Sequence, residues 1–282
     1  MVVSLILFKA NQHYASPVLA MINRWLRWFV VAGALAEIGV YFSWLGRPFW
    51  VLWIIFFIGW FLLDSIYRWL AIQAVSVSPL PLFPRFTLNK SGEEWPVDGR
   101  FLKLRERLRA RGLSPVQSLR AEVATSYYLR LSVYQNKDAS VRVQVAFLPQ
   151  PVGGLAVCFQ LATRLANGDL LITDNHYLPF AGFYPENWSV ERKPNIRGFD
   201  KLFQRHRRRV DSVGRAIDPW SAEPLTDLNA QQVELERLNT EMGFLLPGAD
   251  HEEHGRISYE GRYRVWKEML SLNYFGVAAR YY

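Results

Sequence analysis

The sequence has a single cysteine, Cys158, among its 282 residues. One thiol excludes an intrachain disulfide and a four-thiolate metal site. The phosphate-binding P-loop, the glycine-rich dinucleotide motif and the G-x-S-x-G nucleophile motif are also missing. The chain therefore carries no recognisable signature of an enzyme, and we predict no cofactor.

Charge is scarce in one part of the chain, although the whole sequence has a formal net charge of +8. Seven of the eleven tryptophans lie between Trp25 and Trp69. Long apolar stretches with tryptophan near their ends are typical of membrane spans. The charged residues of this segment are Arg27, Glu37, Arg47, Asp64 and Arg68. This composition argues against a wholly soluble protein.

Two spans are predicted within residues 25–75. The first covers residues 26–45, which as a helix extend about 30 Å, the thickness of the hydrocarbon core of a bilayer. A short turn at Gly46 follows, and the second apolar run covers residues 49–63 and continues to residue 77. Because the turn is so short, we expect an antiparallel transmembrane helical hairpin.

Basic residues predict the orientation of this hairpin. Residues 1–24 are expected to be a cytoplasmic or interfacial segment. Their apolar run, residues 2–8, is too short to span a membrane, and Lys9 follows the run, whereas a signal peptide has its positive charge before the apolar region. Basic side chains flank the outer ends of both spans, whereas the turn has only Arg47. The flanking residues are Lys9, Arg24, Arg27, Arg68, Arg85 and Lys90. The positive-inside rule then predicts a multi-pass protein of the inner (cell) membrane with both termini in the cytoplasm.

Two further parts are expected after the spans. Residues 76–96 contain four prolines, which fix φ and remove hydrogen-bond donors, so an extended tether is expected. Residues 97–282 show alternating patterns and helical patterns, which predict strands and helices respectively. The strands are expected at 128–134, 140–148, 155–165 and 170–173, and the helices at 98–111, 199–213, 229–244 and 259–272. We predict a cytosolic α+β domain with an antiparallel sheet of about four strands covered by helices.

Glu37 is the most informative residue of the spans. It would lie near the bilayer midplane, where an ionised group is costly, and no basic residue of the second run lies at its depth. We expect contact with another membrane protein or a second copy, or a proton or ion path; a neutral, locally bonded glutamic acid is the alternative. Ala32, Ala36 and Gly39 form a small-residue stripe that would let a neighbouring helix approach closely.

A basic cluster lies in the predicted helix 199–213. Beside a membrane it would contact anionic lipid headgroups, whereas the alternative is a solvated or ion-paired helix face; a nucleic-acid partner is not expected. The cluster consists of Lys201, Arg205, Arg208 and Arg209. His206 falls on the apolar side of this helix and is expected to be a packed core histidine.

Polar side chains near the end of the strand 170–173 are candidates for acid–base catalysis. They are Asp174, His176 and Glu186, and the first two would need a turn to bring them together. His251 and His254 are candidate metal ligands, because they are three residues apart and could lie on one face of a helix. The proline and glycines around them favour a solvated loop instead.

These features favour a membrane-anchored, non-catalytic binding or regulatory protein. Its cytosolic domain would engage a partner protein or a ligand at the inner membrane surface. One alternative is a membrane-tethered enzyme that acts on a lipid or small molecule through residues 174–188, and another is a transport-complex subunit that uses Glu37. Convergence of Asp174, His176 and Glu186 in one pocket would favour the enzyme, and their dispersal would favour the binding protein.

Overall fold

Two long apolar helices dominate the N-terminal part of the protein. The computed structural model describes residues 2–14, 16–78, 81–92, 95–124, 127–149 and 155–278. Helix α2 (Pro17–Tyr41) and helix α3 (Phe49–Val77) are long and apolar enough to cross a membrane. Ser16 sets the start of α2, because its hydroxyl accepts the backbone N–H of Leu19 at 3.4 Å. The prediction of two long apolar helices is confirmed.

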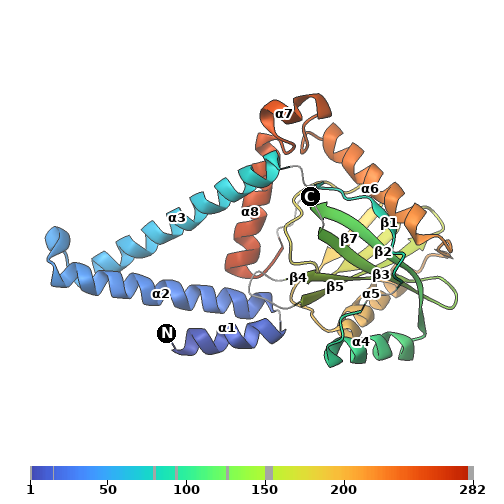
Figure 1. Cartoon of the computed structure of the whole chain (residues 1–282), viewed down its shortest axis with the longest axis horizontal. Helices are drawn as coiled ribbons and strands as arrows, with labels where there is room; N and C mark the ends of the chain where they lie inside the picture. Colours follow the sequence, from blue (N-terminus) through green and yellow to red (C-terminus); the bar gives the residue numbers. More distant parts are fainter. Residues whose placement is uncertain are drawn as a thin grey trace.

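The two helices are joined by the short 3₁₀ helix η1 (Trp44–Gly46), and together α2 and α3 are called the hairpin (Figure 1). The small residues of α2 lie within its packing. Ala32, Ala36 and Gly39 are buried, and a Cβ atom on Gly39 would lie only 3.1 Å from Cδ1 of Leu52 in α3. The small-residue stripe therefore packs inside the hairpin, where small side chains let two backbones approach.

The N-terminal apolar run forms a helix, which is one of its two expected forms. Helix α1 (Val2–Tyr14) lies beside the first half of α2 (Figure 1). Val2, Val3, Leu5 and Ile6 on α1 are more than half exposed. This helix therefore presents an apolar surface outward along the flank of the hairpin.

The sheet has the strand order β1-β2-β3-β4-β5-β6-β7, with β8 paired to β5. The strands are β1 (Phe86–Leu88), β2 (Leu113–Ala124), β3 (Tyr127–Asn136), β4 (Arg142–Pro149), β5 (Leu155–Leu165), β6 (Leu170–Asp174), β7 (Trp188–Arg192) and β8 (Ile217–Asp218). The four predicted strands are β3 to β6, whose neighbours pair antiparallel. The expectation of about four antiparallel strands was nevertheless wrong, because the described residues form a sheet of eight strands and β7 pairs parallel with β6.

The additional strands have weak local patterns. Strand β1 lies in the proline-rich segment and has only three residues. Strand β2 contains Pro115 and two register shifts against β3, which interrupt a simple alternation. Strand β7 follows a loop rich in aromatic residues and becomes a strand by pairing with β6.

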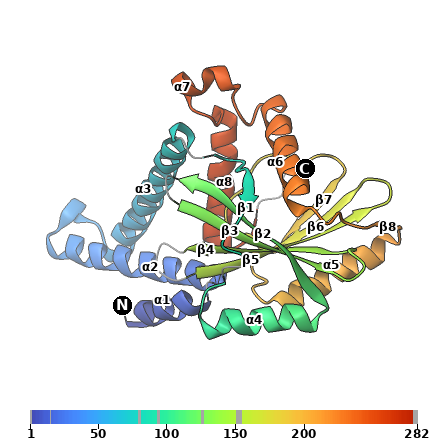
Figure 2. The same ribbon diagram turned by 45° about the vertical axis from the view of Figure 1, so that its right-hand side comes forward.

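Helices cover both faces of the sheet (Figure 2). Helices α4 (Gly99–Ala110) and α5 (Phe199–Val213) cover one face, where Leu108 and Leu202 pack against strand residues such as Val143. On the other face, Leu228 of α6 (Pro224–Glu241) packs with Cys158 and its neighbours. Both faces are therefore apolar, as the buried alternating residues of β4 and β5 require.

Helix α8 (Tyr259–Phe275) connects the hairpin to the sheet. It follows η2 (Gly248–Asp250) and α7 (His251–His254), and it crosses the opening between α2 and α3 (Figure 1). The indole N–H of Trp266 donates to the carbonyl of Ser65 at 3.0 Å, and that of Trp25 donates to the carbonyl of Tyr274 at 3.0 Å. The base of the hairpin thus packs against the C-terminal helix.

Part of the proline-rich segment 76–96 is packed into the fold. Ser76 is fully buried, Phe83 is 8% exposed, and Phe86 opens β1 at the edge of the sheet. Trp95 packs against the core under α4. The segment is therefore more than an extended tether, because its apolar residues between the prolines contribute to the core.

Candidate ligand-binding site

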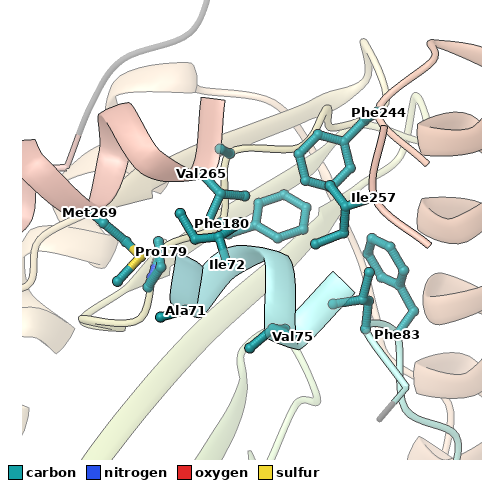
Figure 3. Close-up of a pocket in the computed structure, with 12 residues that line it drawn as sticks. Ala71, Ile72, Val75, Phe83, Pro179, Phe180, Phe244, Ile257, Val265 and Met269 are labelled. Carbon is teal, nitrogen blue, oxygen red and sulfur yellow. The ribbon is translucent and has the colours of Figure 1, made fainter. Parts of the chain in front are cut away.

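An apolar cavity lies where the end of α3 meets the sheet and α8 (Figure 3). This junction cavity has a volume of about 300 Å³. Its walls include Ile72 and Val75 of α3, Phe83, Phe180, and Val265 and Met269 of α8. Phe244 and Ile257 also line the cavity, so segments that are far apart in the sequence build one apolar pocket at the base of the hairpin.

Helical spacing explains how the two helices contribute. Ile72 and Val75 are three residues apart, and Val265 and Met269 are four apart, so each pair lies on one helix face. Phe180 is held by the loop between β6 and β7, and its ring lies 6.0 Å from that of Phe83 in an edge-to-face arrangement. The aromatic residues of this loop thus have a packing role.

A second cavity of about 280 Å³, the sheet cavity, lies on the face of the sheet beneath α6. It shares Leu82, Phe83, Pro179 and Phe180 with the junction cavity, so the two adjoin through common walls. The floor of the sheet cavity includes Cys158. Burial raises the pKa of the Cys158 thiol to about 11, so it remains protonated at neutral pH and is a poor nucleophile.

A buried ionic cluster lies beside the sheet cavity, whose lining includes Asp174, Tyr184 and Arg192. Arg192 of β7 donates from Nε to Oδ1 of Asp174 at 3.1 Å and from Nη2 to the hydroxyl of Tyr184 at 3.2 Å. Its Nη1 lies 3.7 Å from Oε1 of Glu268 in α8. Asp174 and Glu268 are each 2% exposed, so Arg192 balances two carboxyl groups away from water.

The environment shifts the pKa values of this cluster in different directions. Burial lowers the pKa of Arg192, but the carboxylates of Asp174 and Glu268 outweigh it and raise the pKa overall. Burial raises the pKa of Glu268 and of Tyr184, and it lowers the pKa of His176. Arg192 therefore stays charged and His176 is neutral near pH 7.

The three candidate catalytic residues do not converge. Asp174 and His176 both line the sheet cavity, but Glu186 is exposed and lies outside its lining. Oδ1 of Asp174 accepts the backbone N–H of His176 at 3.0 Å, so this hydrogen bond does not involve the imidazole ring. With its carboxylate also paired to Arg192, Asp174 has a structural role in this arrangement.

Glu37 lies on the outer surface of α2. Its side chain is exposed, whereas Ala36 beside it is fully buried against the interior of the hairpin. The carboxylate thus points away from the packed face of α2. Any contact with a helix outside the hairpin would be made by Glu37 on this outer face, and not by the small-residue stripe.

The basic residues of α5 divide into two groups. Arg205 makes two hydrogen bonds to Glu191, at 3.0 and 2.6 Å, and Arg209 donates to the carbonyls of Ile172 and Ser189. Lys201 and Arg208 are exposed. Contact with lipid headgroups stays a prediction for these two, while Arg205 and Arg209 already bind the sheet.

His206 lies fully buried on the inner side of α5, as predicted. Its ring nitrogens lie 3.0 Å from the hydroxyls of Thr163 and Thr173. Burial, with a smaller effect from Arg209, lowers the pKa of His206 to about 3. It is therefore a neutral core histidine.

The two histidines of α7 have different surroundings. Nε2 of His251 lies 2.7 Å from the carbonyl of Leu246, whereas the side chain of His254 is 58% exposed and lies 3.7 Å from Glu253. Among the described residues, no group of three or more histidine, cysteine, aspartate or glutamate side chains is placed to hold a metal ion.

Sequence reasoning did not identify the residues that build the two cavities. Phe83 and Met269, which both line the junction cavity, are 186 positions apart, and neither belongs to a motif. The one available signal was the concentration of aromatic residues at 176–188, because so many rings in a loop indicate burial.

Comparison with protein-family models, curated proteins and solved structures finds no match to this chain.

Proposed function

We propose that this chain is a membrane-anchored, non-catalytic binding protein. In this proposal α2 and α3 cross the inner membrane, and the α+β part lies at the cytoplasmic surface, where it takes up an apolar ligand in the junction cavity. The basic residues that flank the base of the hairpin support this orientation, because the turn at its other end has only Arg47. Both termini would then lie in the cytoplasm.

The observation that carries the proposal is the composition of the junction cavity. One of its walls is the last part of α3, which would leave the bilayer at this point, and the remaining walls come from the α+β part. Its volume of about 300 Å³ lies at the lower end of the range for ligand pockets. A cavity that is small, apolar and next to a membrane suits a single acyl chain.

Charge in the neighbouring cluster favours binding over catalysis. Arg192 donates to Asp174, to Tyr184 and to the carbonyl of Leu178 at 3.2 Å. These contacts use its three donor nitrogens within the protein, so the cluster is suited to holding β7 and α8 in place. By fixing β7 and α8, the cluster helps to hold Val265 and Met269, the α8 residues that line the junction cavity, in place for a ligand.

Photocrosslinking in native membranes tests this function. The probe is palmitate with a diazirine near the end of its chain, and adducts are mapped by mass spectrometry. We expect adducts on Met269 and Phe180, and Ala71→Phe should reduce them strongly because Ala71 lines the cavity. Ala74→Phe is the matched control, since Ala74 is exposed on the same helix. Equal labelling in wild type and Ala71→Phe would contradict the proposal.

A further inference from the structure

A separate cavity of about 410 Å³, the hairpin cavity, lies between α1, α2 and α3 at the base of the hairpin. Its charged residues are Arg24 and Arg27 of α2 and Asp64 and Arg68 of α3. Three guanidinium groups therefore face one carboxylate. This excess of positive charge in a partly enclosed space favours an anion.

The single carboxylate is already used by the protein. Asp64 accepts from Nε of Arg68 at 2.6 Å and from Nη2 at 3.3 Å, which is an i,i+4 ion pair within α3. The hydroxyl of Tyr274 also donates to Asp64. One carboxylate that is already paired with Arg68 leaves an excess of positive charge from Arg24 and Arg27 in the cavity.

Two buried polar atoms of hairpin-cavity residues, one on Arg24 and one on Asn23, have no hydrogen-bond partner in the protein. Nη1 of Arg24 is buried without a hydrogen bond, while the Tyr274 ring lies 5.8 Å from its guanidinium carbon. Asn23 is 7% exposed, and its Oδ1 also has no hydrogen bond. Buried polar groups are normally paired, since an unpaired one costs about 1–3 kcal/mol. A ligand with both acceptor and donor groups would satisfy them.

The other side of the cavity is apolar. Trp28 and Val31 lie about one and two turns beyond Arg24 toward the tip of the hairpin, and Trp60 lies about one turn beyond Asp64 in the same direction. Phe8 of α1 completes this wall. The cavity is therefore charged at the base of the hairpin and apolar toward its centre, which is the polarity of a lipid that enters with its headgroup at the base.

We infer that the hairpin cavity binds the headgroup of an anionic phospholipid that carries a free hydroxyl. Its phosphate would accept hydrogen bonds from Arg24 and Arg27, and the hydroxyl would donate to Oδ1 of Asn23. One acyl chain would lie along Trp28 and Trp60. This inference rests on the proposed membrane placement of α2 and α3, but it concerns a cavity distinct from the junction cavity.

Native mass spectrometry of the full-length protein, delipidated in mild detergent, tests the inference. Phosphatidylglycerol, phosphatidylcholine and inorganic phosphate are titrated separately against wild type and three variants. Arg24→Gln should raise the phosphatidylglycerol concentration for half occupancy by about tenfold or more, because a charge-assisted hydrogen bond is lost. Arg27→Gln should raise it by a smaller factor. Arg47→Gln, exposed at the opposite end of the hairpin, should leave it unchanged.

Three results would overturn the inference: equal occupancy in wild type and Arg24→Gln, equal binding of phosphatidylcholine, or binding of inorganic phosphate without the lipid. If Arg24→Gln does not fold, the exposed Arg27→Gln variant decides the question by the same titration. The Ala71→Phe variant should keep its phosphatidylglycerol. Equal palmitate labelling in wild type and Ala71→Phe, with intact phosphatidylglycerol binding, would therefore count against the proposed function alone.

Discussion

Ile257 donates its backbone N–H to Oγ of Ser76 at 3.0 Å, across 181 positions of sequence. The neighbouring residue, Arg256, donates its backbone N–H to the carbonyl of Ser76 at 2.8 Å. These bonds join the last turn of α3 to the segment that precedes α8. The hairpin and the C-terminal part are thus held together at the point where the chain leaves α3.

Replacing Ser76 tests this link. Ser76→Ala leaves the buried N–H of Ile257 without a partner, so we expect a loss of about 1–3 kcal/mol in the free energy of unfolding. Thermal unfolding in detergent measures the change. Ser78→Ala is the control, because Ser78 is partly exposed and its hydroxyl bonds the nearby carbonyl of Val75. Equal melting temperatures for the two variants would show that the link is not stabilising.

Arg192 is expected to be essential for stability. Arg192→Met removes the positive charge between Asp174 and Glu268 and leaves two buried carboxyl groups unpaired, which should cost about 3–5 kcal/mol. Lys193→Met, one position away, removes a charge that pairs with the more accessible Glu191 at 3.3 Å and should cost less than about 1 kcal/mol. Chemical denaturation of both variants compares them, and similar midpoints would disprove the role of Arg192.

The lowered pKa of His206 predicts how the stability of the protein depends on pH. Its pKa is about 3 in the folded protein and about 6.5 when unfolded. Below pH 6.5 the unfolded chain therefore binds a proton that the folded chain does not, and stability falls by up to about 1.4 kcal/mol per pH unit until the pH approaches 3. His206→Gln should reduce this slope between pH 6 and pH 4.5 by the share that His206 contributes. His254→Gln should retain it, because that residue is exposed.

Glu37 is expected to contact a helix outside this chain. Glu37→Gln keeps a donor and an acceptor and should preserve such a contact, whereas Glu37→Leu should weaken it by about 0.6–2 kcal/mol and leave membrane insertion intact. Crosslinking in native membranes compares the two variants with wild type. Identical monomeric bands in all three would remove the case for a helix partner. Loss of a cellular phenotype in Glu37→Gln with unchanged crosslinking would instead favour protonation of Glu37.

Local patterns determined several elements of this protein by themselves. The long apolar runs alone predict α2 and α3, because each of these helices corresponds to one continuous run in the sequence. The turn at Asn167-Gly168 set the β5–β6 hairpin, and Gly168 has the φ of +85° that such a turn uses. Asp64 and Arg68 pair as their spacing requires, and His206 lies in the core because its helix face is apolar.

Tertiary structure alone decided which distant segments meet. Strand β1 becomes a strand only by pairing with β2, and β7 only by pairing with β6. The partner of the small-residue stripe was also undetermined, since a stripe specifies close packing without specifying which helix approaches. The physical reason is that local spacing fixes the face on which a side chain lies, whereas its neighbour depends on long-range packing. Both the junction cavity and the Arg192 cluster are therefore products of the fold, built from residues that no local pattern connects.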